Sequence, residues 1–261
     1  MAQPKALVLR AAGTNCDREA EHALQLAGFA AERVHVFRLM ESPQRLAEFQ
    51  FLLVPGGFSY GDDVAAGKIL ANQMLRRLAE PLNEFLAAGK LVLGICNGFQ
   101  VLLKSGLLPG GRVRAETANC DVTLSWNDSA RFECRWVHLK AEDSPCVFCT
   151  PGEMLALPVA HGEGKFICRD DSVLRSLQAG GQVVLRYCNA AGEPGGYPIN
   201  PNGSVDDIAG ICDATGRVMG LMPHPERFVD PTQHPQWTRR SVARPDGLSL
   251  FQRAFAYLNQ N

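Results

Sequence analysis

The chain has 261 residues, 46% of them hydrophobic, and its formal net charge at pH 7 is −1. This length and apolar content are enough for a sizeable core, and the balanced charge, without an unusual basic cluster, argues against nucleic acid as a partner. No apolar run is long enough to span a membrane and the first residues lead directly into a strand. We therefore expect a cytoplasmic protein with no membrane partner, built as one domain over residues 1–261.

The first part of the chain alternates between strand and helix patterns. We expect strands at residues 5–10, 33–37 and 51–55, with a helix between the first two and a short helix beginning at Ser42. Thr14, Asn15 and Asp17 suit the start of the first helix, which runs to about residue 27 and is closed by Gly28. This alternation predicts a parallel sheet with right-handed crossovers, whose functional crevice lies beyond the carboxyl ends of the strands.

A glycine-rich loop at residues 55–63 follows the third strand and precedes a long helix predicted over residues 64–88. Its glycines give the backbone freedom to direct an N–H group into the crevice, although an ordinary connecting loop has the same composition. A phosphate-binding loop would need Gly-Lys-Ser or Gly-Lys-Thr after the glycines. Gly67-Lys68-Ile69 is neither in place nor followed by a hydroxyl, so we expect no phosphate site here.

The segment at residues 90–104 is predicted to be a buried strand that runs directly into a helix, with Cys96 at the junction. Its apolar residues do not alternate, which is typical of a strand covered by helices on both faces. Gly94 and Gly98 lie two residues before and after the cysteine, the spacing of a nucleophile elbow. A thiol placed there lies at a helix N-terminus, which favours the thiolate. Cys96 is therefore the candidate nucleophile, and the alternative is a small buried cysteine at a strand end.

Shorter strands dominate the second half. We expect them at residues 131–139, 154–160, 182–188, 208–213 and 218–222, the last two joined by a turn at 214–217. No linker of biased composition separates this part, so we assign it to the same domain. We predict an α/β fold whose sheet is mostly parallel and doubly wound, with an antiparallel β excursion in the second half. An amphipathic helix at residues 246–258 should turn Leu248, Phe251, Phe255 and Leu258 inward.

The nine cysteines are an odd number, scattered through a chain that is too large to need disulfides for its stability. This pattern indicates reduced thiols rather than a disulfide framework. Cys146 and Cys149 form a C-x-x-C pair, but the further candidate ligands Cys134, His138 and His161 include no second compact pair. We therefore expect no metal in this chain.

A cysteine nucleophile needs a base for its proton, and two of the six histidines are candidates. His224 directly follows the last predicted strand, between Pro223 and Pro225, and Glu226 can reach back to orient its ring. Nucleophile, base and orienting acid then form a triad. His161 also has an acidic residue two positions later and remains a rival base. Its glycine neighbours should make it mobile, which suits a contact loop better than a base.

Together these motifs resemble the triad, or class I, glutamine amidotransferases. The likeness rests first on Gly94-Ile-Cys-Asn-Gly-Phe-Gln100 and Pro223-His-Pro-Glu226. Four further motifs, at residues 14–17, 56–62, 161–164 and 200–204, resemble those of the glutaminase subunits of phosphoribosylformylglycinamidine synthase. Six separated motifs agree in order from the first strand to about Phe228, whereas residues 229–245 match nothing that we recognise.

The resemblance implies a role for each matching residue. Cys96 would attack the side-chain amide carbon of glutamine, giving a γ-glutamyl thioester and ammonia. His224 would act as acid and base, and Glu226 would orient it. The groups that bind the oxyanion and the substrate would be the backbone N–H groups of Gly57 and Asn97 and the side chain of Gln100.

The same resemblance implies partners. A large synthetase subunit would receive the ammonia and amidate formylglycinamide ribonucleotide in de novo purine biosynthesis, and a small accessory subunit would complete the complex. ATP and magnesium would act on the synthetase, so no cofactor is expected in this chain. The loops at residues 161–164 and 200–204 are candidates for the docking face, because they are glycine-containing and have no triad role.

Two alternatives stay open at this point. The chain could serve another class I amidotransferase, or a related α/β cysteine hydrolase. It could also be a catalytically silent binding subunit whose triad survives without turnover.

Overall fold

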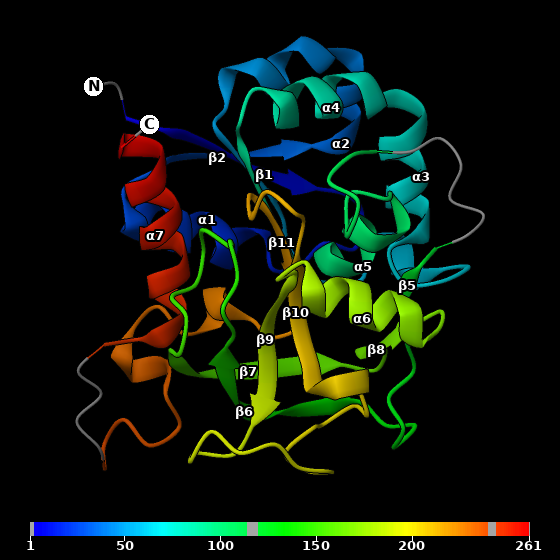
Figure 1. The fold of residues 1–261 in the computed structure, drawn as a ribbon. Helices are drawn as coiled ribbons and strands as arrows, with labels where there is room; N and C mark the ends of the chain where they lie inside the picture. Colours follow the sequence, from blue (N-terminus) through cyan, green and yellow to red (C-terminus); the bar gives the residue numbers. More distant parts are fainter. Residues whose placement is uncertain (1–2, 114–119, 240–243, 261) are drawn as a thin grey trace.

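The computed structural model describes residues 3–113, 120–239 and 244–260, whose strands form a nine-stranded mixed sheet and a separate two-stranded sheet (Figure 1). Five neighbouring strands of the large sheet are parallel: β2 (Ala30–His35), β1 (Lys5–Arg10), β3 (Phe51–Val54), β4 (Leu91–Ile95) and β11 (Val218–Leu221). The other four follow with antiparallel pairing: β10 (Ile208–Cys212), β9 (Val183–Cys188), β6 (Glu133–Ala141) and β7 (Met154–His161). The predicted fold class is confirmed.

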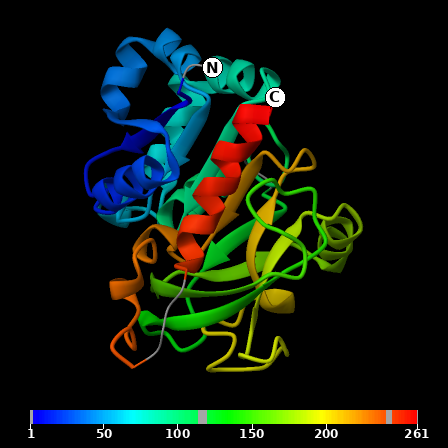
Figure 2. The same ribbon diagram turned by 90° about the vertical axis from the view of Figure 1, so that its left-hand side faces the viewer.

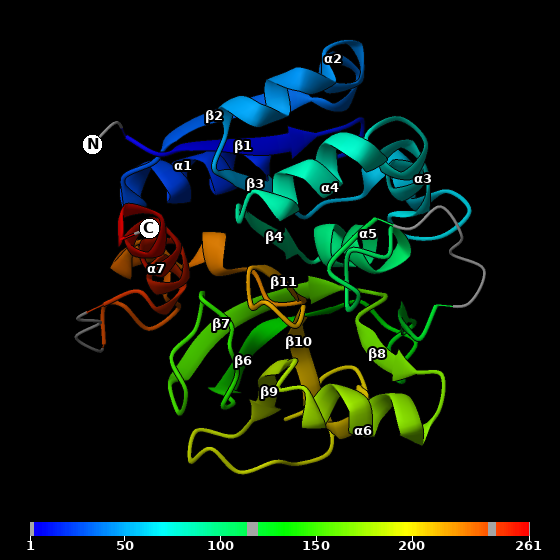
Figure 3. The same ribbon diagram turned by 45° about the horizontal axis from the view of Figure 1, so that its top comes forward.

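Helices cover both faces of the parallel strands. The chain steps from β1 outward to β2 and then back past β1 to β3 and β4. Right-handed crossovers in opposite directions place their helices on opposite faces. Thus α1 (Asp17–Ala27) lies on one face with α7 (Asp246–Gln260), and the other face carries α2 (Val36–Glu41), α3 (Lys68–Arg77), α4 (Ala79–Ala87) and α5 (Asn97–Lys104) (Figure 3).

The burial pattern follows this arrangement. Every residue of β3 and β4 is buried, because both faces of these strands are covered. In β6, by contrast, buried and exposed positions tend to alternate, as expected of an antiparallel strand with one solvated face. The terminal helix α7 contacts both α1 and β7, and so packs against the parallel and the antiparallel halves (Figure 2). No helix within the described residues is both long and apolar enough to cross a membrane.

The predicted long helix over residues 64–88 is wrong in its extent. Val64 is exposed with φ +71°, and the helical segment is divided at Leu78 into α3 and α4. Pro81 explains the division, since a proline has no N–H for the carbonyl of Arg77 and its ring would clash with that carbonyl in a continuous helix. The proline is instead accommodated in the first turn of α4.

Two other boundaries differ from the prediction. The second strand begins and ends earlier than residues 33–37, and His35 caps the short helix α2 by accepting a hydrogen bond from Phe37 N. Helix α1 ends at Ala27 before Gly28 as predicted, but its N-cap is Cys16 and no side chain caps it. Asp17 instead forms ion pairs with Arg10 and Arg33.

The terminal helix is present with its predicted residues turned inward. Phe251 is fully buried, together with Leu250 and Ala254, and Leu248, Phe255 and Leu258 are partly buried and pack against the core. The short helix expected from Ser42 is the 3-10 helix Pro43–Glu48. Among the strands and α-helices, four were not predicted: α2, the paired strands β5 (Val122–Ser125) and β8 (Lys165–Cys168), and the helix α6 (Asp171–Ala179).

Candidate active site

The candidate site lies where three neighbouring parallel strands end. In the sheet, Val54 of β3 is in register with Gly94 of β4, and Ile95 of β4 is in register with Leu221 of β11. Because parallel strands end at the same edge, the segments that follow them meet there. These are the glycine loop after β3, Cys96 after β4, and the segment with His224 after β11.

Cys96 has the backbone geometry of a nucleophile elbow. It lies between β4 and α5 with φ +52° and ψ −107°, a conformation that non-glycine residues rarely adopt. A Cβ on Gly98 would overlap the carbonyl oxygen of Val54, and a Cβ on Gly94 would come within 2.6 Å of Leu102 Cδ1. The two flanking glycines are therefore required by close packing of α5 against β3 and β4. Cys96 N donates to Leu221 O at 2.8 Å, which fixes the turn to β11.

His224 and Glu226 form a buried pair beside this turn. His224 Nδ1 lies 2.6 Å from Glu226 Oε1, and each residue is only 1% exposed. The backbone N–H of His224 donates to Pro158 O of β7 at 2.8 Å. Burial alone would lower the pKa of His224. The negative charge of Glu226 and the proximity of the Cys96 and Cys16 thiols outweigh it, so the pKa is raised well above 6.5.

The thiol of Cys96 and the imidazole of His224 face a common point next to Gly56. A Cβ on Gly56 would lie 2.8 Å from His224 Cε1 and 3.4 Å from Cys96 Cβ. Cys96 itself is 6% exposed, and its Sγ is 3.8 Å from Ala160 O of β7. The arrangement brings together a thiol, an imidazole and a carboxylate, which is sufficient for acyl transfer through a thioester.

The loop expected to supply an oxyanion donor is held in place by the segment after β1. Phe58 N donates to Gly13 O at 3.0 Å, and Thr14 bridges to Gly57, which has φ +130°. A Cβ on Gly57 would approach Asn15 N to 2.7 Å, so only glycine fits. Asn97 is the first residue of α5, and its N–H is among those left unpaired by the helix.

The side chains of Asn97 and Gln100 link the loops around the site. Asn97 Oδ1 accepts from Ser59 N, and its Nδ2 donates to Asp62 and to Gln100 Oε1. Gln100 is buried, and its Nε2 donates to Glu163 O at 2.8 Å. In this structure Gln100 thus ties α5 to the loop after β7, and its contact with glutamine stays a prediction.

His161, the rival base, has a different environment. It is 3% exposed, its Nδ1 lies 3.1 Å from Asn127 Oδ1, and its ring packs against Gly164. The expected mobility is wrong for this buried ring. Burial, reinforced by the charge of His224, lowers the pKa of His161 to about 3. A histidine with this pKa is a weak base at neutral pH.

The two loops expected to dock a partner are bonded to each other through polar side chains that point into the protein. Asn202 Nδ2 donates to Gly164 O at 2.8 Å, and Ser204 Oγ accepts from Phe166 N at 2.9 Å. Asn200, Asn202 and Ser204 are all buried. The polar side chains of the loop at residues 200–204 therefore hold the loop at residues 161–164 against the site.

Cys16 was missed as a member of the site, although it lies in one of the six motifs. It is 1% exposed, and a Cβ on Gly56 would lie 3.2 Å from its Sγ. Arg227 Nη2 donates to this sulfur at 3.1 Å. Burial raises the pKa of the Cys16 thiol, and the hydrogen bond with His224 partly opposes this rise. The signal that could have found it was its position after β1, at the same edge of the sheet as Cys96.

Three side chains that could ligate a metal come together among the described residues: Cys16, His224 and Glu226. Cys146 and Cys149 are not part of such a group among the described residues.

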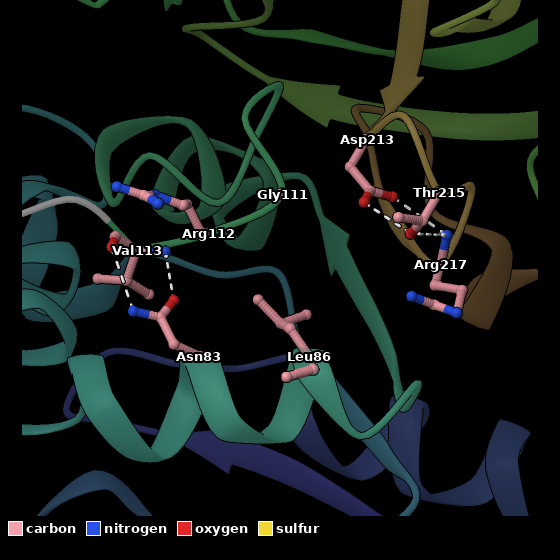
Figure 4. A pocket seen from close by; sticks show the side chains of 9 residues that line it. Asn83, Leu86, Gly111, Arg112, Val113, Asp213, Thr215 and Arg217 are labelled. Carbon is pink, nitrogen blue, oxygen red and sulfur yellow. Dashed lines mark hydrogen bonds between the residues drawn. The ribbon is translucent and has the colours of Figure 1, made fainter.

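A cavity of about 540 Å³ lies elsewhere, between α4, the loop before residue 114 and the β10–β11 turn (Figure 4). Arg217, which lines it, precedes β11, so this cavity is at the sheet edge opposite to Cys96.

Comparisons with known proteins agree over nearly the whole chain. A family model described as a CobB/CobQ-like glutamine amidotransferase domain matches residues 3–258. The chain is 46% identical to phosphoribosylformylglycinamidine synthase subunit PurQ of Dehalococcoides mccartyi, with 100% of both chains covered. It is 42% identical to the subunit of the same name from Methanococcus maripaludis, with 98% of each covered. A chain of the PurLQS structure from Thermotoga maritima superimposes with a TM-score of 0.74 at 34% identity, covering 98% of this chain and 100% of that one.

Proposed function

The chain belongs to the family of CobB/CobQ-like glutamine amidotransferases, and from this premise we propose how it works. It is a glutaminase subunit that hydrolyses glutamine to glutamate and ammonia through Cys96, His224 and Glu226. It delivers the ammonia to a synthetase subunit, which amidates formylglycinamide ribonucleotide in purine biosynthesis. The name shared by its relatives, phosphoribosylformylglycinamidine synthase subunit PurQ, supports this choice among amidotransferases.

The observation that carries the proposal is the meeting of Cys96 and His224 at the ends of the adjacent strands β4 and β11. Glu226, 2.6 Å from the far side of the imidazole, fixes the ring and favours its protonated form. A protonated imidazole beside the sulfur stabilises the thiolate that attacks the glutamine amide. The same proton is then available for the departing ammonia.

The oxyanion formed by this attack would be held by the backbone N–H groups of Asn97 and Gly57. Each such donor contributes roughly 10²–10³ to the rate in related chemistry. Loss of ammonia leaves a γ-glutamyl thioester on Cys96, and His224 then takes a proton from the water that hydrolyses it. Gln100 is placed one helical turn from the nucleophile, where it can contact the glutamine or the loop that covers it.

Free ammonia would be lost to solvent, so we expect the chain to act within a complex. The solved relative comes from a PurLQS assembly, which supports a large synthetase and a small accessory subunit as partners. ATP and magnesium are expected to act on the synthetase, and no cofactor is expected in this chain. We place the protein in the cytoplasm, together with the complex in which we propose that it acts.

Cys96 and His224 are buried, so we expect docking to the synthetase also to control access of glutamine to the site. With exposures of 6% and 1%, these side chains are largely covered in the isolated chain. We expect low glutaminase activity alone and a higher rate in the complex, because the loops over the site must move to admit the substrate. A silent binding subunit would stay inactive in both states.

The test uses the complete complex with the synthetase. Cys96→Ala should abolish synthesis from glutamine and leave synthesis from added ammonia intact, because ammonia enters after the glutaminase step. Loss of both activities would show that the thiol is structural. If both activities were retained, Cys96 would not be the nucleophile.

A further inference from the structure

The glycine loop after β3 is strained and has little apolar support. Tyr60, Asp62 and Val64 have φ values of +56°, +56° and +71°, in the left-handed region that non-glycine residues rarely adopt. Phe58 and Val64 are exposed, so they bury little apolar surface that would offset this strain. Strained loops persist where the surrounding contacts fix them. The contacts that hold this loop therefore also set the direction of the Gly57 N–H, one of the two proposed oxyanion donors.

The loop is fastened on two sides. On the side of β1, Tyr60 N donates to Ala12 O at 2.7 Å. On the side of α5, Ser59 N donates to Asn97 Oδ1 at 3.2 Å. Asn97 also supplies the second proposed oxyanion donor, its own backbone N–H. Its side chain therefore connects the two halves of the proposed oxyanion hole.

Asp62 completes this connection. Its Oδ1 accepts from Asn97 Nδ2 at 2.9 Å, and both Asn97 and Ser59 are buried. An ionised carboxylate only accepts hydrogen bonds, and a backbone N–H only donates. Because the Asn97 amide lies between the Asp62 carboxylate and Ser59 N, it fits in one orientation. A hydrogen bond to a charged acceptor is also stronger than a neutral one. Asp62 therefore fixes the side chain that holds Ser59.

The same amide orients Gln100. Asn97 Nδ2 also donates to Gln100 Oε1 at 2.9 Å, and Gln100 Nε2 donates to Glu163 O at 2.8 Å. Asp62 thus acts on the oxyanion donors and on the predicted glutamine contact through one side chain. Kinetics separate the two effects, because the oxyanion forms only during the reaction, whereas Gln100 would contact glutamine as soon as it binds.

A salt bridge does not account for Asp62. Burial raises the pKa of its carboxyl, and among the groups that oppose this rise the charge of Lys104 has a smaller effect than the Asn97 amide. Lys104 Nζ instead donates to Ala66 O at 2.5 Å. The next residue, Asp63, is exposed, and its carboxylate has no hydrogen-bond or ion-pair partner in the described part of the chain. Asp63 is therefore a matched control from the same loop.

We propose that Asp62 is a positioning residue for the glutaminase reaction. Through the side chain of Asn97, it holds the N–H groups of Gly57 and Asn97 in the arrangement that binds the oxyanion. This role rests on the proposed function, because the oxyanion forms only when Cys96 attacks glutamine. A misplacement of about 1 Å at a catalytic group can cost about 10²-fold in rate, so a residue that acts only through another can have a large effect.

The first experiment compares Asp62→Ala with Asp63→Ala in the complete complex. Asp62→Ala should lower kcat with glutamine by about 10–10²-fold and change KM by less than about threefold, while synthesis from added ammonia continues. Asp63→Ala should match the wild type. An unchanged kcat in Asp62→Ala, or an equal loss in Asp63→Ala, would overturn the proposal. A loss confined to KM would also overturn it, because Asp62 would then act on glutamine binding through Gln100.

A double-mutant cycle tests whether Asp62 acts through Asn97. In an Asn97→Ala background, Asp62→Ala should lower kcat by less than about twofold further, because the link is already broken. Independent losses that multiply would overturn the link. Should Asp62→Ala fail to fold, Asp62→Asn keeps the size and one acceptor but loses the charge, and it should lower kcat at least about threefold. A wild-type kcat in Asp62→Asn would then overturn the proposal.

Alkylation of Cys96 with iodoacetamide, followed by peptide mass spectrometry, separates this role from general damage to the site. The thiolate forms a bond to carbon as iodide leaves, and no oxyanion develops. Asp62→Ala complex should therefore be alkylated at Cys96 within about twofold of the wild-type rate. A loss of alkylation that parallels the loss of kcat would show that Asp62 supports the thiol or the fold instead. Absence of glutaminase in the wild-type complex would contradict the proposed function, whereas equal kcat of Asp62→Ala in an active complex would contradict this inference alone.

Discussion

The parallel and antiparallel halves of the sheet contribute to the site in different ways. The parallel half supplies every side chain of the proposed triad, from the segments after β4 and β11. The antiparallel half contributes mainly backbone carbonyl groups: Pro158 O holds His224 N, Ala160 O lies against Cys96 Sγ, and Glu163 O holds Gln100. The parallel half therefore supplies the reacting side chains, and the antiparallel half holds them in position.

The two buried histidines make this contrast sharpest. His224, after β11, has a carboxylate at Nδ1 and a raised pKa, while His161, at the end of β7, has an amide at Nδ1 and a lowered pKa. Burial disfavours the charged form of both. The group next to Nδ1 sets the direction of the pKa shift, so two histidines that are equally buried differ in their chemistry.

The largest expected effect is on the glutamine-dependent rate, and it distinguishes the roles of the two histidines. His224→Asn should lower the glutamine-dependent rate of the complex by roughly 10²–10⁴-fold, because the acid and base of the reaction is lost. His161→Asn should cost far less, since asparagine can place its Nδ2 where the imidazole Nδ1 meets Asn127. Steady-state rates with glutamine and with ammonia measure both variants. A larger loss for His161→Asn would make His161 the base.

A second prediction concerns packing in the two halves. Gly98→Ala should lower the free energy of unfolding by about 1–3 kcal/mol, because the new methyl overlaps the Val54 carbonyl and pushes α5 from β3. Gly196→Ala, in the loop between β9 and β10, meets nothing within 4 Å and should change it by less than about 0.5 kcal/mol. Denaturant titration of both variants checks this. Similar stabilities would show that the elbow is not tightly packed.

A third prediction uses pH. The pKa of His161 falls from 6.5 to about 3 on folding, so below pH 6.5 the unfolded chain binds a proton that the folded chain refuses. Stability should therefore fall as pH falls, by up to about 1.4 kcal/mol per pH unit from this group. His161→Asn should flatten the slope between pH 6.5 and about 3, measured by denaturant titration in pH steps. An unchanged slope would place the acid sensitivity on other groups.

The sequence was informative where the cause of structure is local. The glycines around Cys96 predicted the elbow because close packing of α5 permits no side chain at Gly94 or Gly98. The partnership of Cys96 with His224 was predicted from their chemistry. The parallel pairing of β11 with β4 that brings them together was not, because residues 218–222 were expected in the antiparallel part of the sheet.

What the sequence did not predict depends on contacts between distant segments. Helix α6 is an exception, because the cap that Asp170 provides to Ser172 N and Val173 N is local and could have been read from the sequence. The inward orientation of Asn202 depends on Gly164, 38 residues away. The position of Cys16 after β1 indicates the correct edge of the sheet, but its contact with the triad depends on how the loops after β1 and β3 pack together, which the sequence pattern does not specify.

The central claim is that Cys96 is the nucleophile that reacts with the glutamine amide. The most direct measurement is labelling of the complex with a glutamine-mimicking electrophile, followed by peptide mass spectrometry. We expect one label on Cys96, slowed by His224→Asn and absent in Cys96→Ala. A label on Cys16 or another cysteine that persists in Cys96→Ala would contradict it.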